Sequence, residues 1–334
     1  MNSYNRRLFI KAAVVSGVGM HLIDGIPAFA QQPSGKKVGI IGLDTSHSVA
    51  FTKALNAATP DPVYDGYKVV AAYPYGSKDI ESSVKRIPGY IEEVKKMGVE
   101  ITGSVKELLS KVDVVLLETN DGRLHLEQAL EVFKAGKRMF IDKPVAGTLS
   151  DTIAIYEASE KYKIPVFSAS SLRYIKGIDG IDKAKVLGAD TYSPATLEKT
   201  HPDFFWYGIH GVETLYTVMG TGCKSVTRIS TPDTDIVVGI WADGRTGTFR
   251  GTRTGKHDYG GTVFTQDGNK VLGPYAGYEP LLVEIIKYFK TGEVPVTPKE
   301  TIEIFAFMEA ADESKRQGGK SVSLESVMAK AKKK

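Results

Sequence analysis

The stretch from Lys36 to His47 constrains the fold of this chain more than any other part of the sequence. Residues 38–43 are all apolar or glycine, which is typical of a parallel strand covered on both faces. Apolar residues then follow at the i, i+3, i+4 and i+7 spacing of a helix with one apolar face: Phe51, Ala54, Leu55 and Ala58. The stretch therefore predicts a strand, a tight turn and a helix. Dinucleotide-binding folds begin in this way, with a pyrophosphate at the N-terminus of the helix.

Strand-like and helical segments continue to alternate through the first half of the chain. Further strands are predicted at residues 67–73, 99–101, 113–118, 138–141 and 164–168. Helices are predicted between them, including a polar one over 79–97 that we expect to be interrupted at Pro88. This alternation predicts an α/β fold, a Rossmann-like doubly wound parallel sheet over residues 36–170.

The pattern changes after about Ser170. Strand-like runs at 225–229, 234–242, 245–253 and 262–265 are joined or followed by the turn dipeptides Asp243-Gly244 and Asp267-Gly268. Helices are predicted at 210–219, 281–289 and 301–316. Residues 171–334 are therefore predicted to form an α+β domain with an open antiparallel sheet. We expect this sheet to provide the surface of a homo-oligomer.

The first 30 residues have the pattern of a twin-arginine signal peptide. Arg6 and Arg7 precede a weakly apolar run over 12–23, and Ala28-Phe29-Ala30 offers small residues to a signal peptidase. The apolar run is shorter than the roughly 20 residues that a membrane span needs. We therefore expect export by the twin-arginine route, a mature periplasmic protein that begins at Gln31, and no membrane attachment after cleavage.

The overall charge excludes some partners and sites. The formal net charge is only +4, and residues 1–30 contain three of the basic side chains, so nothing indicates nucleic-acid binding. The single Cys223 excludes an internal disulfide and a cysteine-rich metal site. Metal-ligand types occur at Asp44, His47, Glu118 and His201, but without close ligand spacing, so no metal site is predicted.

Two short motifs place the chain near a known family. Asp142-Lys143-Pro144 follows the fifth predicted strand, and Gly208-Ile209-His210 opens a predicted helix. With the helical segment over 304–319, they resemble the glucose–fructose oxidoreductase/inositol dehydrogenase (Gfo/Idh/MocA) family across nearly the whole mature chain. This resemblance implies an NAD(P)-dependent oxidoreductase that acts on a small molecule, a sugar, polyol or related hydroxyl compound.

The resemblance also implies roles for particular residues. Lys143 falls on the family's lysine near the reacting carbon, although Asp142 replaces the usual glutamate before it. His210 falls on the family's histidine; Trp206 stands where an acid is common, and Glu213 fills the later acidic position. We therefore expect Lys143 and His210 to be the catalytic residues, since a lysine or a histidine can take the hydroxyl proton while hydride leaves carbon.

The cofactor turn departs from the family pattern. The G-x-G-x-x-G fingerprint here reads Gly42-Leu43-Asp44-Thr45-Ser46-His47, so only the first glycine remains. An Asp44 carboxylate facing the phosphates would repel them, whereas an Asp44 that caps the helix would not. No acid follows the second strand. Ser77 and Lys78 there either receive the 2′-phosphate of NADP or form a solvated turn.

The candidate site residues follow from these motifs, and the cofactor is NAD or NADP. Candidate cofactor-binding residues are Gly39, Gly42, Leu43, Asp44, Thr45, Ser46, His47, Ser77, Glu118, Asn120, His125, Asp142 and Lys143. Candidate substrate-binding residues are Arg173, Tyr174, His201, Trp206, Tyr207 and His210. For these the alternative roles are inter-domain packing (Arg173 and Tyr174), a turn (His201) and an aromatic core (Trp206 and Tyr207).

Three functions are compatible with these observations. The first is an exported NAD(P)-dependent oxidoreductase, and the second is a redox-neutral lyase or hydrolase on sugars that keeps its NAD(P) tightly bound. The third is a binding protein on the same scaffold that has lost the cofactor, for which the altered turn is the argument. The sequence leaves open the substrate, the choice between NAD and NADP, and the oligomeric state.

Overall fold

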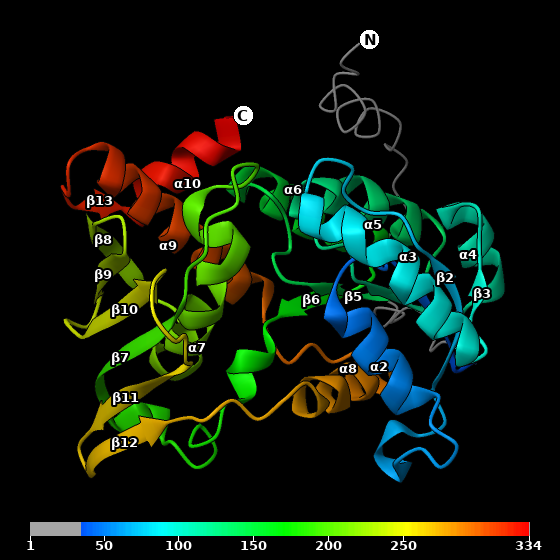
Figure 1. Ribbon diagram of the computed structural model, residues 1–334. Coiled ribbons are helices and arrows are strands. Elements are labelled where there is room, and N and C mark those ends of the chain that lie inside the picture. Colours follow the sequence, from blue (N-terminus) through cyan, green and yellow to red (C-terminus); the bar gives the residue numbers. More distant parts are fainter. Residues whose placement is uncertain (1–34, 334) are drawn as a thin grey trace, which may run out of the picture. The chain divides into compact units, whose positions relative to one another are not determined.

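The structure is a computed structural model that describes residues 35–333; the predicted signal peptide lies outside them. The first domain is built on a six-stranded sheet in which all strands run parallel, in the order β3-β2-β1-β4-β5-β6 (Figure 1). Its strands are β1 (Lys37–Ile41), β2 (Lys68–Tyr73), β3 (Glu100–Ile101), β4 (Val114–Leu117), β5 (Arg138–Asp142) and β6 (Val166–Ala169). This is the strand order of a dinucleotide-binding doubly wound sheet, so the predicted fold class is confirmed.

Helices cover both faces of this sheet. One face packs against α4 (Val105–Lys111), α5 (His125–Lys134) and α6 (Leu149–Tyr162). The other packs against α2 (Ser46–Leu55), the end of α3 (Glu81–Lys96) and α8 (Glu279–Thr291). The alternation along β1 follows from this arrangement, since Val38 and Ile40 face one layer and Ile41 the other.

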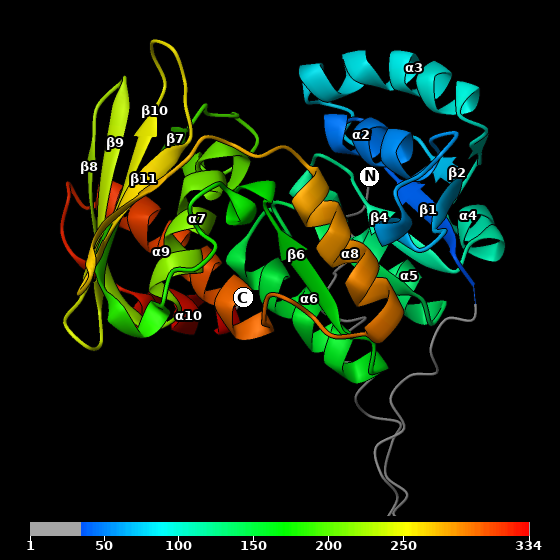
Figure 2. The ribbon, with the colours of Figure 1, turned by 90° about the horizontal axis from the view of Figure 1, so that it is seen from below.

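Helix α8 comes from the second half of the chain but completes the first domain (Figure 2). The guanidinium of Arg138, on β5, donates a hydrogen bond of 2.8 Å to the carbonyl of Phe289. The rings of Tyr288 and Phe167 pack edge to face with centroids 5.1 Å apart. The loop that leads into α8 is thereby held at the carboxyl ends of the parallel strands.

The prediction of an interruption at Pro88 was wrong, because α3 runs through it. Proline removes the amide that would donate to the carbonyl of residue 84. Val84 is 44% exposed on the outer side of the helix, so water can satisfy that carbonyl. The cost of the missing bond is thus small at this position.

The second domain contains a seven-stranded sheet in the order β12-β11-β7-β10-β9-β8-β13. The strands are β7 (Val186–Pro194), β8 (Cys223–Ser230), β9 (Thr234–Trp241), β10 (Thr246–Thr252), β11 (Gly260–Thr265), β12 (Gly268–Leu272) and β13 (Val322–Ser323). Sequence analysis missed β7, whose residues include Gly188, Asp190 and Pro194, which disfavour strands. It also runs parallel to β10, so the sheet is mixed rather than wholly antiparallel.

One face of the second sheet is covered and the other is open. Helices α7 (Ile209–Met219) and α9 (Pro298–Arg316) lie between the two sheets, as Figures 1 and 2 show, and α10 (Leu324–Lys333) packs beside α9. On the open face, β-strand side chains leave large apolar groups exposed: Leu187, Tyr192, Ile229, Ile240 and Val271.

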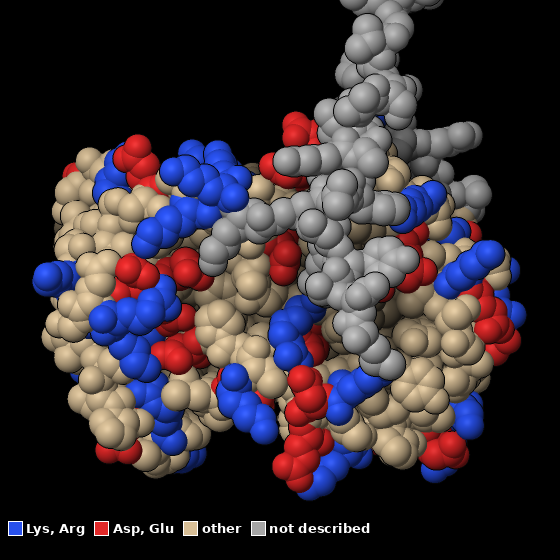
Figure 3. Space-filling view, turned by 90° about the horizontal axis from the view of Figure 1, so that it is seen from above, with Lys and Arg blue, Asp and Glu red and all other residues tan. Residues whose placement is uncertain are grey.

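The surface shows no concentration of one charge on the face that Figure 3 presents, where basic and acidic side chains are mixed. Within residues 35–333, no helix has the length and apolar character needed to cross a membrane.

Candidate functional site

A cavity of about 180 Å³ lies at the carboxyl ends of the parallel strands, against the second domain. From the first domain it is lined by the start of α2, by α3 and by the loops after β4 and β5: Thr45, Ser46, His47, Ser82, Arg86, Asn120 and Lys143. The second half of the chain contributes Ser171, Leu172, Trp206, Tyr207, His210, Tyr259, Tyr275 and Tyr278. Ligands of doubly wound sheets bind at this edge of the sheet.

Both candidate catalytic residues lie in this cavity. Lys143 follows β5 directly, and its Nζ lies 5.8 Å from the centre of the Tyr207 ring. His210 lies in the first turn of α7, with Nδ1 2.6 Å from the Oγ of Ser170. Burial and the nearby charge of Lys143 hold the pKa of His210 well below its ordinary value, so its imidazole is neutral near pH 7. A neutral imidazole beside a lysine can accept a proton from a hydroxyl group in the cavity.

The aromatic run before His210 forms a π-helical turn, η5 (Phe204–Gly208). Phe204 and Phe205 pack into the core against Phe249 and Phe305, with ring centroids 5.4 and 5.0 Å apart respectively. Trp206 and Tyr207 instead line the cavity. The position of Trp206 and Tyr207 thus agrees with a substrate-facing role, and the aromatic core is formed by Phe204 and Phe205.

Gly39, in β1, and Gly42, in the turn after it, allow close backbone packing and do not line the cavity. Gly42 has φ of +94°, and a Cβ there would lie 2.5 Å from the backbone of Thr119. A Cβ at Gly39 would meet Leu108 at 2.9 Å, and Leu43 is buried in the core. These residues thus let β1 and its turn pack closely against α4 and the loop after β4.

Asp44 points away from the cavity. Its carboxylate accepts hydrogen bonds from the amides of Asn120 (2.9 Å) and Ser77 (3.4 Å), so it joins the loops after β2 and β4. Burial raises its pKa to about 6. Asp44 does not form the expected cap on the helix, because Thr45 is the N-cap of α2 and no described side chain accepts from the first amides of the helix.

The residues present fit a bound NAD(P) at this turn. No side chain in the described part of the chain caps the N-terminus of α2, and Thr45 and Ser46 line the cavity there. Across residues 35–333, no carboxylate pairs with Arg86 or with Lys143, which line the same cavity. A free helix N-terminus and two unpaired cations favour an anionic group such as a pyrophosphate. Because Asp44 is turned away and hydrogen-bonded, it does not face that group.

Ser77 does not line the cavity; its side chain hydrogen-bonds to residues just before α3. Its Oγ accepts from the amide of Ile80 at 3.2 Å and donates to Asp79 at 2.9 Å. Its neighbour Lys78 is exposed. The hydroxyl is therefore already engaged, which weakens its assignment to a 2′-phosphate.

A cluster of three buried polar side chains lies beside the cavity. His47 Nδ1 is 3.0 Å from Asp142 Oδ2 and 4.0 Å from Glu118 Oε2. Burial raises the pKa of Glu118 well above its usual range, and the charge of Asp142 adds to this effect. Burial also opposes ionisation of Asp142, but the facing His47 and the nearby Lys143 lower its pKa overall.

Four other predicted residues do not line the cavity. The ring nitrogens of His125 contact the carbonyls of Thr119 (2.6 Å) and Val145 (3.3 Å), so this buried histidine holds together the loops after β4 and β5. Arg173 forms buried ion pairs with Glu213, at 3.0 Å, and Glu300. Tyr174 packs against the apolar cluster beneath α8.

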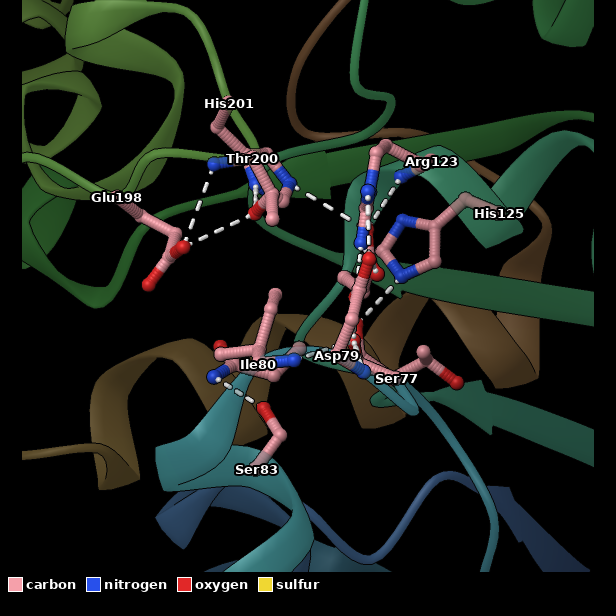
Figure 4. Close-up of polar contacts among 12 residues, drawn as sticks. Ser77, Asp79, Ile80, Ser83, Arg123, His125, Glu198, Thr200 and His201 are labelled. Carbon is pink, nitrogen blue, oxygen red and sulfur yellow. Dashed lines mark hydrogen bonds and ion pairs between the residues drawn. The ribbon is translucent and has the colours of Figure 1, made fainter.

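His201, the fourth, points toward the loop after β4 (Figure 4). Its Nε2 lies 3.4 Å from Asp121, which also binds Arg123, and Arg123 in turn pairs with Asp79 at 2.5 Å. The His201 ring packs on that of Trp206 with centroids 5.2 Å apart. His201 thus supports a cavity residue without entering the cavity.

Sequence reasoning missed several cavity residues. Ser82 and Arg86 lie on α3, and Tyr259, Tyr275 and Tyr278 come from segments that join β10 to β11 and β12 to α8. Tyr278 reaches His47 with ring centroids 4.5 Å apart and contacts the hydroxyl of Ser46 at 3.2 Å. The only local signal was the glycine-rich loop Gly273-Pro274-Tyr275-Ala276-Gly277-Tyr278, in which two tyrosines stand outside any predicted element.

Comparison with known proteins agrees with this fold. Similar solved structures include a probable dehydrogenase from Thermotoga maritima (20% identity, 87% of this chain and 99% of that chain, TM-score 0.70). Another is myo-inositol 2-dehydrogenase from Lactobacillus plantarum (17%, 86% and 98%, 0.70). A third is scyllo-inositol dehydrogenase from Lactobacillus casei with bound NAD(H) and scyllo-inositol (15%, 86% and 99%, 0.67). Comparison with curated protein sequences gave no match.

The family comparison is more specific than these structural similarities. Residues 36–170 match the Gfo/Idh/MocA model, which is described as an oxidoreductase family with an NAD-binding Rossmann fold. The match includes β1, the turn after it and α2, and it ends one residue after β6. Over residues 36–170, the chain is therefore similar to the NAD-binding Rossmann domain of the Gfo/Idh/MocA oxidoreductase family, as its motifs indicated.

Proposed function

We propose that this protein is an exported oxidoreductase that oxidises a hydroxyl group of a sugar, a polyol or a related compound with NAD(P). The observation that carries the proposal is that Lys143 and a neutral His210 line one cavity together with the uncapped start of α2. The cavity thus combines a binding site for an anionic cofactor, at the start of α2, with a proton-accepting group, His210. The dehydrogenase neighbours support the same chemistry, although they are related to this chain in fold alone.

Residues on both sides of the cavity have distinct tasks in this proposal. Arg86 and the first amides of α2 would hold the phosphates, and Asn120 lines the same cavity. A bound NAD(P)⁺ would supply the acceptor for the hydride that leaves carbon. In the tautomer whose Nδ1–H donates to the Oγ of Ser170, the Nε2 of His210 carries a free lone pair and takes the hydroxyl proton. The Lys143 ammonium stabilises the negative charge that develops on the substrate oxygen.

The cavity favours a small polar ring as substrate. Trp206, Tyr207, Tyr259 and Tyr275 give it flat aromatic walls, and the three tyrosines add hydroxyl groups. Aromatic faces and hydroxyl donors are suited to a sugar or cyclic polyol. The scyllo-inositol bound in the Lactobacillus casei enzyme is a compound of this class.

Export and assembly are parts of the same proposal. The twin arginines and the Ala28-Phe29-Ala30 segment support export of the folded protein to the periplasm. The exposed apolar side chains on the open face of the second sheet support a homo-oligomer formed through that face. Replacing Ile229 with lysine there should lower the mass measured by sedimentation, whereas Val63→Lys, on the first domain, should not.

The test is a single-turnover assay in which purified protein, loaded with NAD⁺ or NADP⁺, is mixed with a panel of sugars and polyols. Absorbance at the nicotinamide band reports cofactor reduction, and product analysis reports substrate conversion. Stoichiometric reduction supports the proposal. Substrate conversion without net reduction would favour a redox-neutral enzyme, and binding without either change would favour a binding protein.

A further inference from the structure

Three side chains at the carboxyl ends of neighbouring strands direct polar atoms at one buried point. His47 comes from the first turn of α2 after β1, Glu118 directly follows β4, and Asp142 ends β5. One ligand atom of each lies within 4.8 Å of those of the other two. The exposed fractions of the three residues are 5%, 0% and 0%.

These atoms have no hydrogen-bond partner among the described residues. This holds for Nδ1 of His47 and for all four carboxylate oxygens of Glu118 and Asp142. The approach of His47 Nδ1 to Asp142 Oδ2, at 3.0 Å, lacks the alignment of a hydrogen bond. Two fully buried carboxyl groups without donors are costly unless a cation or a proton compensates them.

The nearest fixed cation does not provide that compensation by contact. Lys143 follows Asp142 in sequence, yet the structure shows no ion pair within 4.0 Å between its Nζ and either carboxylate. Its side chain extends toward the ring of Tyr207 instead. The cluster therefore keeps an excess of acidic ligand atoms aimed at one space.

We propose that His47, Glu118 and Asp142 bind one divalent transition-metal ion. Two ligand atoms that each lie about 2.1 Å from one ion are about 3.0–3.4 Å apart, so the observed 3.0 and 4.0 Å separations need only a small contraction. One imidazole and two carboxylates suit Zn²⁺ or Mn²⁺ better than Mg²⁺, which prefers oxygen ligands alone. Three protein ligands also leave coordination positions open, as in catalytic sites.

The place of this site gives the ion access to the same small molecules as the cavity. His47 contributes both to the cluster and to the cavity wall. A hydroxyl or carbonyl oxygen of a ligand in the cavity, or water, is the class of group that would complete the coordination. The inference stands on the cluster alone and does not depend on oxidation by NAD(P).

Metal binding is measured on the full chain without cofactor or substrate. After treatment with EDTA and desalting, the protein is titrated by calorimetry with ZnCl₂, MnCl₂ and MgCl₂. Manganese binding is followed independently by loss of the free-ion signal in electron paramagnetic resonance. We expect one equivalent of Zn²⁺ or Mn²⁺ to bind, and weaker binding of Mg²⁺. If neither transition-metal ion binds at millimolar concentration, the site is a proton-sharing cluster and the proposal is overturned.

Variants assign the binding to these residues. His47→Ala, Glu118→Gln and Asp142→Asn should each weaken binding by at least about tenfold. His257→Ala and Glu131→Gln, at exposed positions away from the cluster, are control variants that should bind as the parent does. Circular dichroism identifies any variant that fails to fold. If a variant does not fold, the number of metal ions bound by the parent protein still tests whether the site exists. Unchanged affinity in all three folded variants would place the ion elsewhere and contradict the assignment. Cofactor titration in EDTA tests the proposed function separately.

Discussion

The Nδ1 atom of His210 lies 2.6 Å from the Oγ of Ser170, and this contact joins the last loop of the first domain to the first turn of α7. The same Oγ accepts the amide of Leu172 at 3.1 Å, so Ser170 is itself fixed in position. The remaining nitrogen of His210 is therefore the one that can exchange a proton within the cavity. Because burial and Lys143 lower the pKa of His210, it is in the proton-accepting form near neutral pH.

Removing either candidate catalytic group should slow the chemical step. We expect Lys143→Met and His210→Asn each to reduce the single-turnover rate by roughly 10²–10⁴-fold, as is typical for loss of an acid–base group. Lys270→Met and His257→Asn change the same residue types at exposed positions and should be neutral. A near-normal rate in either cavity variant would show that this chain does not use the family's residue at that position.

The buried carboxyl of Asp44 should make stability depend on pH. Its folded-state pKa is about 6 against an ordinary 3.8, so the folded state binds more protons between these values and stability falls as pH rises through that range. Asp44→Asn cannot titrate. Relative to the parent, its free energy of unfolding should therefore increase by up to about 3 kcal/mol between pH 4 and pH 7. Urea unfolding curves at both pH values measure this, and a difference that does not change with pH would contradict the burial of an ionisable Asp44.

The turn after β1 should require glycine at position 42. Its φ of +94° and the 2.5 Å that would separate a Cβ from the backbone of Thr119 both oppose a side chain. We expect Gly42→Ala to lower the free energy of unfolding by about 2–4 kcal/mol. Gly98→Ala is the matched control, since Gly98 also has a positive φ (+81°) but has nothing within 4 Å of a Cβ, so only backbone strain applies. Equal losses in the two variants would show that the close approach to Thr119 is unimportant.

Export should depend on the paired arginines. Arg6→Lys and Arg7→Lys together should leave the precursor in the cytoplasm, because the twin-arginine route reads this pair. Fractionation and immunoblotting of cells that produce the parent or the double variant measure the outcome. Lys11→Arg is a control that leaves the pair intact. Periplasmic accumulation of the double variant would contradict export by the twin-arginine route.

The order of the first domain was predictable because four of its strands, β1, β4, β5 and β6, are almost wholly buried, and helical segments with apolar spacing alternate with the strands. The motif residues Lys143 and His210 were predictable by resemblance, since Lys143 directly follows a predicted strand and His210 opens a predicted helix. The tyrosines at 259, 275 and 278 were not, because they lie in irregular loops whose path depends on packing between distant parts of the chain.

Side-chain direction was the other feature that sequence could not supply. The altered turn put Asp44 at a glycine position, but only the structure shows its carboxylate bonded to the amides of Ser77 and Asn120. In the same way, the sequence separates His47, Glu118 and Asp142 by tens of residues, whereas the parallel sheet brings the ends of β1, β4 and β5 side by side. Convergence of this kind depends on strand order, which becomes informative only after the fold is known.

The most direct test of the central claim is calorimetric titration of the full chain with NAD⁺, NADH, NADP⁺ and NADPH. We expect saturable binding of at least one of them. Arg86→Gln should weaken it, because Arg86 lines the cavity beside the start of α2 and pairs with no carboxylate among residues 35–333. Arg250→Gln, an exposed arginine on the second sheet, should bind as the parent does. Failure of all four nucleotides to bind at millimolar concentration, with no cofactor found by mass spectrometry in the purified protein, would contradict the proposed oxidation.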